Sequence, residues 1–219
     1  MNIKHGNYKI HRYLSLSGLL GGVFYFSHII MGRIFYKGYN PLTQAVSDLT
    51  ALNSPSRNIA LIFSVLYGIC TVIFVIYFFI YYKGKLNKIV SLGAFSFCIM
   101  AVISFLGYTF FPLSTSGYAG TFQDKMHLLV TILVVAFTII SILLFCIGFF
   151  RTKNHKYLGI ISLCAFIFLA TGAMLVNILP KEYFGVAERI NIYTVIIYTC
   201  ILSAWMYKYI IGLLPSSGR

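Results

Sequence analysis

The sequence predicts an all-α membrane protein: a six-helix transmembrane bundle with a short amphipathic helix in its first outer loop. Two observations carry this prediction. Hydrophobic residues make up 59% of the 219 residues and charged residues only 10%, whereas a soluble domain carries roughly 25% charged residues. In addition, six apolar stretches of the chain are long enough to cross the ~30 Å hydrocarbon core of a bilayer as helices.

The apolar stretches run without the alternation over ~10 residues that is typical of membrane β-strands, so they predict helices. Together they form one six-helix membrane domain, which we assign to residues 1–214. The last five residues, 215–219, read Pro-Ser-Ser-Gly-Arg and are interpreted as the remnant of a linker. The spans are expected at Tyr13–Phe35, Ile59–Tyr82, Ile89–Phe111, Met126–Phe150, Tyr157–Leu179 and Ile190–Leu214.

The distribution of charge predicts the orientation. The segments between consecutive spans, which we call gaps, alternate between the two sides of the membrane. On one side, the two termini and the second and fourth gaps carry eleven basic residues and no acid. On the other side, the first, third and fifth gaps carry six basic and four acidic residues. Because Lys and Arg beside a span are retained in the cytoplasm, we expect a multi-pass protein of the cell membrane with both termini cytoplasmic. The net charge of +13 is interpreted as this topology signal and not as a nucleic-acid site. Membrane lipids are the expected partners.

The first outer gap, residues 38–52, has the pattern of a short helix. Asn40 is suited to cap its first turn, and Pro41 has a backbone angle that suits the first helical position. Apolar residues then recur at helical spacing and predict a face that lies on the bundle: Leu42, Ala45, Val46, Leu49 and Leu52. We expect this segment to cover the outer end, with Asp48 on or near its polar face.

The other two outer gaps also carry polar groups. Phe111-Pro112 ends the third span, because proline cannot continue a helix, and Asp124 and His127 follow at the mouth of the fourth. Glu188 lies where the last helix begins, a place where a negative charge suits the helix dipole.

Several of these motifs resemble a large family of uncharacterised prokaryotic six-helix membrane proteins. The resemblance rests on Asn40-Pro41-Leu42 with Ser47-Asp48-Leu49, on Phe111-Pro112 followed by His127, and on Gly185 with Glu188-Arg189-Ile190. It covers nearly the whole chain and implies a fold but no activity. The family often has cysteine and aspartate directly after Phe-Pro, where this chain has Leu113 and Ser114, so a role of that aspartate does not carry over.

All four acids, Asp48, Asp124, Glu182 and Glu188, lie in the outer gaps, which makes this face the candidate site. Imidazole and carboxylate groups are common zinc ligands, so His28, His127 and Asp124 are candidate metal ligands. No HExxH pattern is present, and the ligands would have to come from separate helices.

Other interpretations use the same face. A nucleophilic mechanism would need a serine with a histidine base and a carboxylate, and the catalytic candidates are His127, Asp124, Asp48, Glu188 and Ser114. A structural alternative pairs Arg57 and Arg189 with the carboxylates, since guanidinium groups bind carboxylates in a fork. The candidate ligand-binding residues are His28, Asp48, Arg57, His127, Glu188 and Arg189.

The middles of the spans contain no Asp, Glu, Lys or Arg, which argues against an ion-coupled carrier. No Walker motif, dinucleotide fingerprint or haem-type histidine pair at mid-depth is present, and the sequence does not identify a cofactor. Two hypotheses remain. The protein binds a lipid or other amphiphile in an outward-facing pocket under the loop cover, or it is a membrane-embedded hydrolase or transferase that acts, with or without a metal ion, on a lipid or peptide at the outer leaflet.

Overall fold

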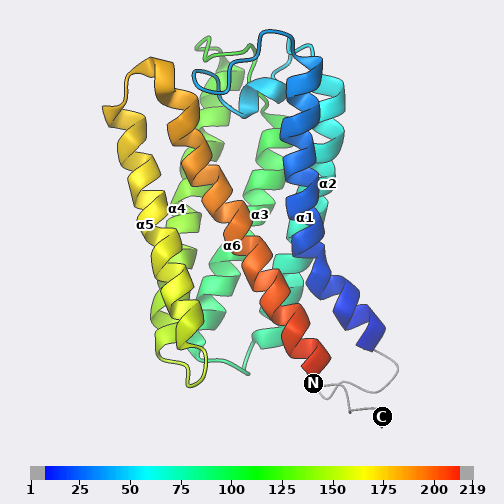
Figure 1. Cartoon of the computed structure of the whole chain (residues 1–219), viewed down its shortest axis with the longest axis vertical. Helices are drawn as coiled ribbons and strands as arrows, with labels where there is room; N and C mark the ends of the chain where they lie inside the picture. The colour runs from blue at the N-terminus through cyan, green and yellow to red at the C-terminus, as the bar shows by residue number, and fades with distance from the viewer. Residues whose placement is uncertain (1–7, 213–219) are drawn as a thin grey trace.

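The computed structural model describes residues 8–212, and its six long helices confirm the predicted all-α bundle (Figure 1). All six are long and apolar enough to cross a membrane. The residues interpreted as a linker remnant, 215–219, lie outside the described part. The long helices are α1 (Tyr8–Phe35), α2 (Arg57–Tyr82), α3 (Lys88–Phe110), α4 (Phe122–Phe150), α5 (Lys156–Ile178) and α6 (Phe184–Gly212).

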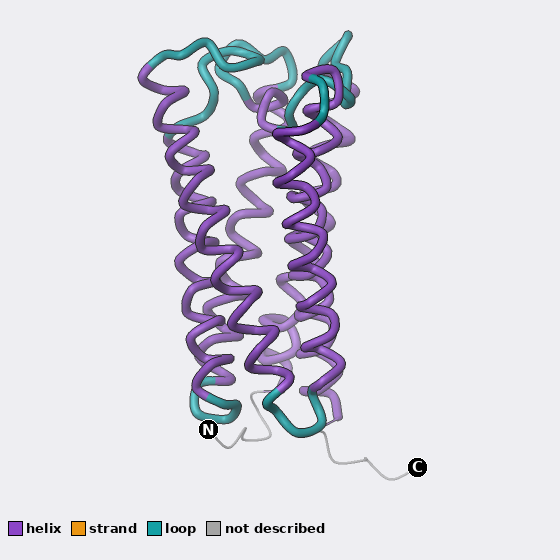
Figure 2. The backbone as a smooth tube through the Cα atoms, turned by 90° about the vertical axis from the view of Figure 1, so that its left-hand side faces the viewer, coloured by secondary structure: helices purple, strands orange, loops and turns teal. Residues whose placement is uncertain are grey.

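Each helix packs against its neighbours in sequence, and α6 returns to pack against α1, so the helices follow one another around the bundle. Figure 2 shows the connections gathered at the two ends of the bundle. We call one end the covered end; it carries the loops 36–56, 111–121 and 179–183. We call the other the basic end; it carries the loops 83–87 and 151–155 together with the start of α1 and the end of α6.

Two helices begin four or more residues earlier at the covered end than the apolar stretches indicate. Helix α4 begins at Phe122 because Thr121 caps it: the Thr121 hydroxyl accepts from the Asp124 N–H and the Asp124 carboxylate accepts from the Thr121 N–H. Helix α6 begins at Phe184, directly after a short 3₁₀ helix η3 (Lys181–Tyr183). Both starts carry polar residues, which a search for apolar runs leaves out.

The core of the bundle lies towards the basic end. Phe145 of α4 is fully buried, and its ring centroid is 5.9 Å from that of Phe78 on α2 and 6.0 Å from that of Phe97 on α3. It is also 6.2 Å from the ring of Tyr198 on α6. Aromatic side chains from four helices thus meet at one point, and such pairs stabilise more than their buried area alone.

Close packing of α1 on α6 depends on small residues. A Cβ atom on Gly18 would lie 2.8 Å from Cβ of Ser203 and 2.9 Å from the Phe74 ring, so a larger residue would separate the helices. The Ser203 hydroxyl also lies between a backbone N–H and a backbone carbonyl of α1 that are four residues apart. It accepts from the Leu19 N–H at 3.0 Å and donates to the Ser15 carbonyl at 2.5 Å. Such an insertion bends a helix, and α1 turns outward towards its lower end in Figure 1.

The helix expected in the first outer loop is present but short. It is the 3₁₀ helix η2 (Ser47–Thr50), and residues 41–44 form a turn before it. The apolar face is buried only in part: Leu49 and Val46 pack into the covered end, whereas Leu42 and Leu52 are each 50% exposed. The helix is shorter than expected because polar contacts, as well as apolar ones, fix this loop. These polar contacts are part of the candidate site.

Candidate functional site

The loop 36–56 begins with a turn organised by Asn40. The Asn40 side chain accepts a hydrogen bond from the Leu42 N–H at 3.0 Å, and the Asn40 carbonyl accepts one from the Gln44 N–H at 2.9 Å. Asparagine favours such a turn because its short side chain bonds to the backbone two residues on. In this turn, the carbonyls of Pro41, Leu42 and Gln44 have no hydrogen-bond partners inside the loop.

Arg189 of α6 binds two of these carbonyls. Its Nη1 donates to the carbonyl oxygens of Pro41 at 2.7 Å and Gln44 at 2.9 Å, and to the carbonyl of Gly185 on its own helix at 2.7 Å. Its Nη2 donates to the hydroxyl of Tyr39. A guanidinium presents several donors in one plane, which lets a single side chain fasten the loop to α6.

Tyr39 extends this connection. Its hydroxyl donates to the Ala45 carbonyl at 2.7 Å while it accepts from Arg189. Burial raises the pKa of Tyr39, although Arg189 beside it lowers the pKa in part, so the hydroxyl keeps the proton that it donates.

Gly185 allows the loop to approach α6 closely. Its N–H donates to the Leu42 carbonyl at 2.8 Å. A Cβ atom at this position would lie 2.5 Å from the carbonyl oxygens of both Pro41 and Gln44. Only glycine therefore fits between the loop and the first turn of α6.

Asp48 is buried and fastens loop 36–56 to loop 111–121. Its Oδ2 accepts from the Ala45 N–H at 3.1 Å, and its Oδ1 accepts from the Gly117 N–H at 3.0 Å. Gly117 has a positive φ of 70°, a conformation that glycine adopts without strain. Asp48 points inward, and its partners are backbone N–H groups.

Asp124 organises the loop 111–121. The side chain is 0% exposed, and its Oδ1 accepts from the Ser114 N–H at 2.7 Å. Its Oδ2 accepts from the Ser114 hydroxyl at 2.9 Å and from the N–H groups of Ala119 at 3.1 Å and Thr121 at 3.2 Å. Hydrogen bonds to a charged acceptor are the strong ones, and both carboxylate oxygens are in use.

Glu188 has a different environment from the two aspartates. It is half-buried, and its Oε2 accepts from the Val46 N–H at 2.7 Å. Its Oε1 has no hydrogen-bond partner among residues 8–212. Tyr25 of α1 and Tyr108 of α3 lie near enough to interact electrostatically with the carboxylate.

His28 and His127, the two candidate site histidines, both donate from Nδ1 to a backbone carbonyl. His127 faces the Phe111 carbonyl at 2.8 Å, and its ring centroid is 4.9 Å from that of Tyr108. His28 is buried and faces the Ala60 carbonyl at 2.9 Å. Since a carbonyl only accepts, Nδ1 carries the proton in both rings. The Nε2 of His127 has no partner in the described chain and stays available as an acceptor.

The structure does not bring the candidate metal ligands together. Within residues 8–212, no group of three or more His, Cys, Asp or Glu side chains is placed to hold a metal ion. His28 is bound to α2 through Ala60, and both oxygens of Asp124 accept from its own loop. Asp124 and His127 are near enough for an electrostatic interaction, but they have no third ligand.

A serine-based catalytic arrangement is also not formed. The Ser114 hydroxyl donates to Asp124, so its proton is directed away from His127, whose Nδ1 is bound to Phe111. The predicted nucleophile and base are therefore not paired. This geometry favours a structural role for Ser114.

The ion pairs suggested by the charge pattern do not form. Among residues 8–212, neither Arg57 nor Arg189 makes an ion pair, because the carboxylates accept from backbone N–H groups and Arg189 donates to carbonyls. Arg57 is half-buried, and its Nε is buried without a partner in the described chain. That part of the hypothesis is wrong: Arg189, Asp48 and Glu188 bind loop backbone and not one another.

Comparison with known protein families gives one match. Residues 19–205 match the family described as "Protein of unknown function (DUF998)". The chain belongs to the DUF998 family. No curated protein and no solved structure matches it. The six-helix family expected from the sequence motifs is thereby confirmed, and in this DUF998 chain the motif residues Asn40, Pro41, Asp48, Gly185 and Arg189 hold the cover.

The tyrosines near Glu188 were missed by the sequence analysis. Tyr25 and Tyr67 are in ring contact, with centroids 4.8 Å apart, and Tyr108 donates to the Thr131 hydroxyl at 3.2 Å. The sequence contained an indication of Tyr25 and Tyr67. Both lie well inside their spans, whereas tyrosine in membrane helices is common at the interfacial ends. Tyr39 carried no such indication, since it lies in the first outer gap and not inside a span.

We expect Arg189→Ala to destabilise the protein strongly. The substitution leaves the carbonyls of Pro41 and Gln44 without their charged donor, at a cost on the order of 3 kcal/mol. Lys181→Ala is the control, because Lys181 is exposed on the same end. Thermal unfolding in detergent measures both. Equal, small shifts in Tm for the two variants would show that Arg189 is a solvated surface charge.

Gly185→Ala is expected to detach the loop from α6. The added Cβ would overlap two carbonyl oxygens, and overpacking of this kind typically costs about 1–3 kcal/mol. Gly212→Ala, where a Cβ meets nothing within 4 Å among residues 8–212, should be neutral or slightly stabilising. Limited proteolysis within residues 36–56 reports the detachment directly. Resistance of Gly185→Ala equal to that of the wild type would contradict the close approach.

Proposed function

We propose that this DUF998 membrane protein binds the head group of a lipid or other amphiphile at the covered end, beside Glu188. One observation carries the proposal: Glu188 is half-buried, yet one of its carboxylate oxygens has no partner in the described chain. The unbonded oxygen is not among the fully buried unpartnered atoms of the described chain, so a ligand can reach it. The free oxygen is a suitable acceptor for a ligand, and the Glu188 carboxylate interacts electrostatically with Tyr25 and Tyr108.

The packing around Glu188 supports access from the bilayer. All residues from Glu188 to Val195 in α6 are partly exposed, and eight consecutive residues sample every face of a helix. In α3, none of the residues from Val102 to Phe110 is buried. The inner sides of α3 and α6 are therefore less tightly packed here than near Phe145. An apolar tail would find apolar surface next to a polar head-group position, which is the usual composition of a small-molecule site.

His127 is the second group with a free acceptor at this end. Its Nε2 has no partner within residues 8–212, and its ring lies against Tyr108. The ligand groups expected at this site are hydrogen-bond donors, since the free oxygen of Glu188 and the free nitrogen of His127 both accept. No specific observation favours a hydrolase or transferase at the same place, because Ser114 and His127 are not paired.

Glu188→Gln should reduce binding of the amphiphile without unfolding the protein. The glutamine carbonyl retains an acceptor for the Val46 N–H, so the loop stays attached, while the charge is lost. Glu182→Gln is the matched control, because Glu182 is an exposed acid in the neighbouring loop. Lipid mass spectrometry of the purified proteins measures the retained amphiphile.

We expect several-fold less ligand in Glu188→Gln than in the wild type, and wild-type levels in Glu182→Gln. Two results would contradict the proposal: a wild-type protein that retains no amphiphile, or equal retention by the two variants.

We also propose that the covered end faces the outside of the cell and that both termini are cytoplasmic. The support is the distribution of charge, since the basic end carries Lys and Arg without any acid. Thr43 and Lys153 are exposed on opposite ends of the bundle. In a variant without the five native cysteines, Thr43→Cys should react with a membrane-impermeant maleimide on intact cells. Lys153→Cys should react only after permeabilisation, and the reverse pattern would overturn the orientation.

A further inference from the structure

The free oxygen of Glu188 has a second free polar atom in its vicinity, the hydroxyl oxygen of Tyr25. Tyr25 lies well inside α1, and its hydroxyl has no hydrogen-bond partner within residues 8–212. It is not among the fully buried unpartnered atoms of that range, so the surrounding protein atoms leave room beside it. Tyr25 and Glu188 interact electrostatically. Two free acceptor atoms, one from α1 and one from α6, are therefore available to one ligand.

The negative charge of Glu188 is not neutralised by an ion pair in the described chain. Arg189 and Asp48 interact with it electrostatically, and their charges oppose each other. The guanidinium of Arg189 is already bound to loop carbonyls and to the Tyr39 hydroxyl. Four of the other five basic residues at the covered end are exposed to water: Arg33, Lys37, Lys125 and Lys181. The carboxylate therefore favours a ligand group with a positive charge.

The free atoms also distinguish between two kinds of cation. The carboxylate oxygen of Glu188 and the hydroxyl oxygen of Tyr25 accept hydrogen bonds, and Nε2 of His127 is a further free acceptor at this end. A primary ammonium has three N–H donors, whereas a quaternary ammonium has none and would leave the acceptors unpaired. Tyrosine rings attract both kinds of cation. The N–H groups therefore decide in favour of the primary ammonium.

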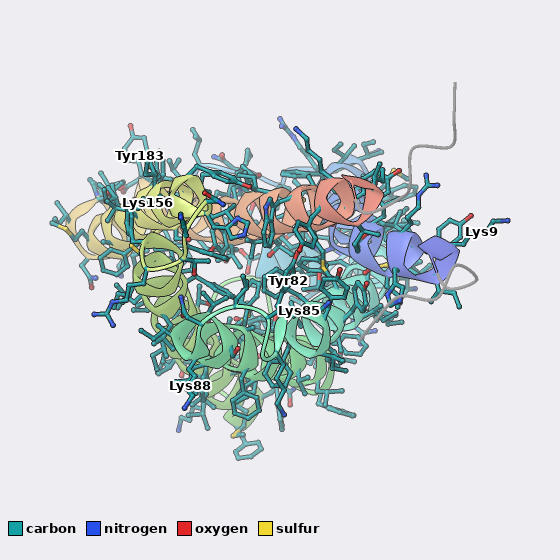
Figure 3. The ribbon with its side chains drawn as sticks, turned by 90° about the horizontal axis from the view of Figure 1, so that it is seen from below. Lys9, Tyr82, Lys85, Lys88, Lys156 and Tyr183 are labelled. Atoms are coloured by element: carbon teal, nitrogen blue, oxygen red, sulfur yellow. The ribbon has the colours of Figure 1, made fainter. Side chains whose placement is uncertain are left out.

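The two ends of the bundle differ in charge, and the difference favours a cation at the covered end. Figure 3 looks onto the basic end, where Lys85, Lys88 and Lys156 are spread over the loops and the helix ends. The four acids of the chain are at positions 48, 124, 182 and 188, all at the covered end. A cationic head group is therefore repelled by the basic end and finds its carboxylate partners at the other.

We propose that the ligand of the covered end carries a primary ammonium group, which donates to the free oxygen of Glu188 and to the Tyr25 hydroxyl. This inference rests on the amphiphile site proposed above and names the chemistry of its head group. Phosphatidylethanolamine is a lipid with such a group, and the partly exposed apolar surface of α3 and α6 beside Glu188 accommodates its tails. A soluble amine offers the same ammonium without tails, and the experiment separates these two sources.

Stepwise N-methylation of one phospholipid tests the inference. Phosphatidylethanolamine, its N-methyl and N,N-dimethyl derivatives and phosphatidylcholine share charge, phosphate and tails, while the N–H donors fall from three to none. We would add each lipid, with identical acyl chains, to the purified full chain in detergent and measure bound lipid by native mass spectrometry. The account predicts an affinity about tenfold or more higher for phosphatidylethanolamine than for phosphatidylcholine, as expected for lost hydrogen bonds to a charged group.

Two variants assign the preference to the proposed acceptors. Glu188→Gln leaves a neutral acceptor, so it should weaken phosphatidylethanolamine binding about tenfold and change phosphatidylcholine binding by less than about twofold. Tyr25→Phe keeps the ring and removes the hydroxyl, so it should reduce the preference several-fold. The matched controls are Glu182→Gln and Tyr183→Phe, which alter exposed residues of the neighbouring loop and should keep the wild-type affinities. Thermal unfolding in detergent checks that each variant is folded.

Glycerophosphoethanolamine, the head group without tails, identifies the source of the ammonium. Displacement of the lipid by an equal concentration of this compound indicates a soluble amine, and no displacement indicates a lipid; either result supports the ammonium site. Equal affinities along the methylation series, or an unchanged preference in Glu188→Gln, would overturn the inference. The amphiphile site itself would stand in that case if Glu188→Gln still lowered the total retained lipid. A wild-type protein that binds none of the four lipids would contradict both.

Discussion

A loop that crosses the end of a membrane bundle has to find hydrogen-bond partners for its backbone, because unsatisfied N–H and C=O groups near hydrocarbon are unfavourable by several kcal/mol each. The loop 36–56 meets this constraint with only one short helix, Ser47–Thr50. Charged side chains supply the remaining partners. Arg189 takes two carbonyls of the loop, and Asp48 and Glu188 take N–H groups on or next to it. The arrangement of the whole covered end follows from these contacts.

This use of charge explains why three of the four acids, Asp48, Asp124 and Glu188, lie at the covered end. A carboxylate that accepts hydrogen bonds from several backbone N–H groups needs no cation. Asp124 accepts from three backbone N–H groups and one hydroxyl group. Glu188 is the exception, since it binds one N–H and keeps one oxygen free. A charged group that stabilises the fold with one oxygen and offers the other to a ligand couples the cover to the proposed amphiphile site. Detachment of the loop at Val46 would change both.

Much of the fold was predictable because long apolar stretches determine it. The six spans and the resemblance to the family follow from hydropathy and short motifs, and the structure and the family match confirm them. The starts of α4 and α6 were misplaced, since Thr121 and Asp124 form a polar cap that hydropathy does not report. The role of Arg189 was also misjudged. Charge patterns suggest partners of opposite sign, but backbone carbonyls carry no signal in a sequence, so a guanidinium that binds them is not predicted.

The central claim is that charged side chains fix the backbone of the covering loops, and hydrogen–deuterium exchange of the full chain in detergent tests it most directly. The account predicts that the amides of Ala45, Val46, Ser114 and Gly117, which donate to Asp48, Glu188 and Asp124, exchange slowly. The exposed loop residues Lys153 and Asn154 should exchange much faster. If the four amides exchanged as fast as those of Lys153 and Asn154, the cover would be held by apolar contacts alone, and the account would be contradicted.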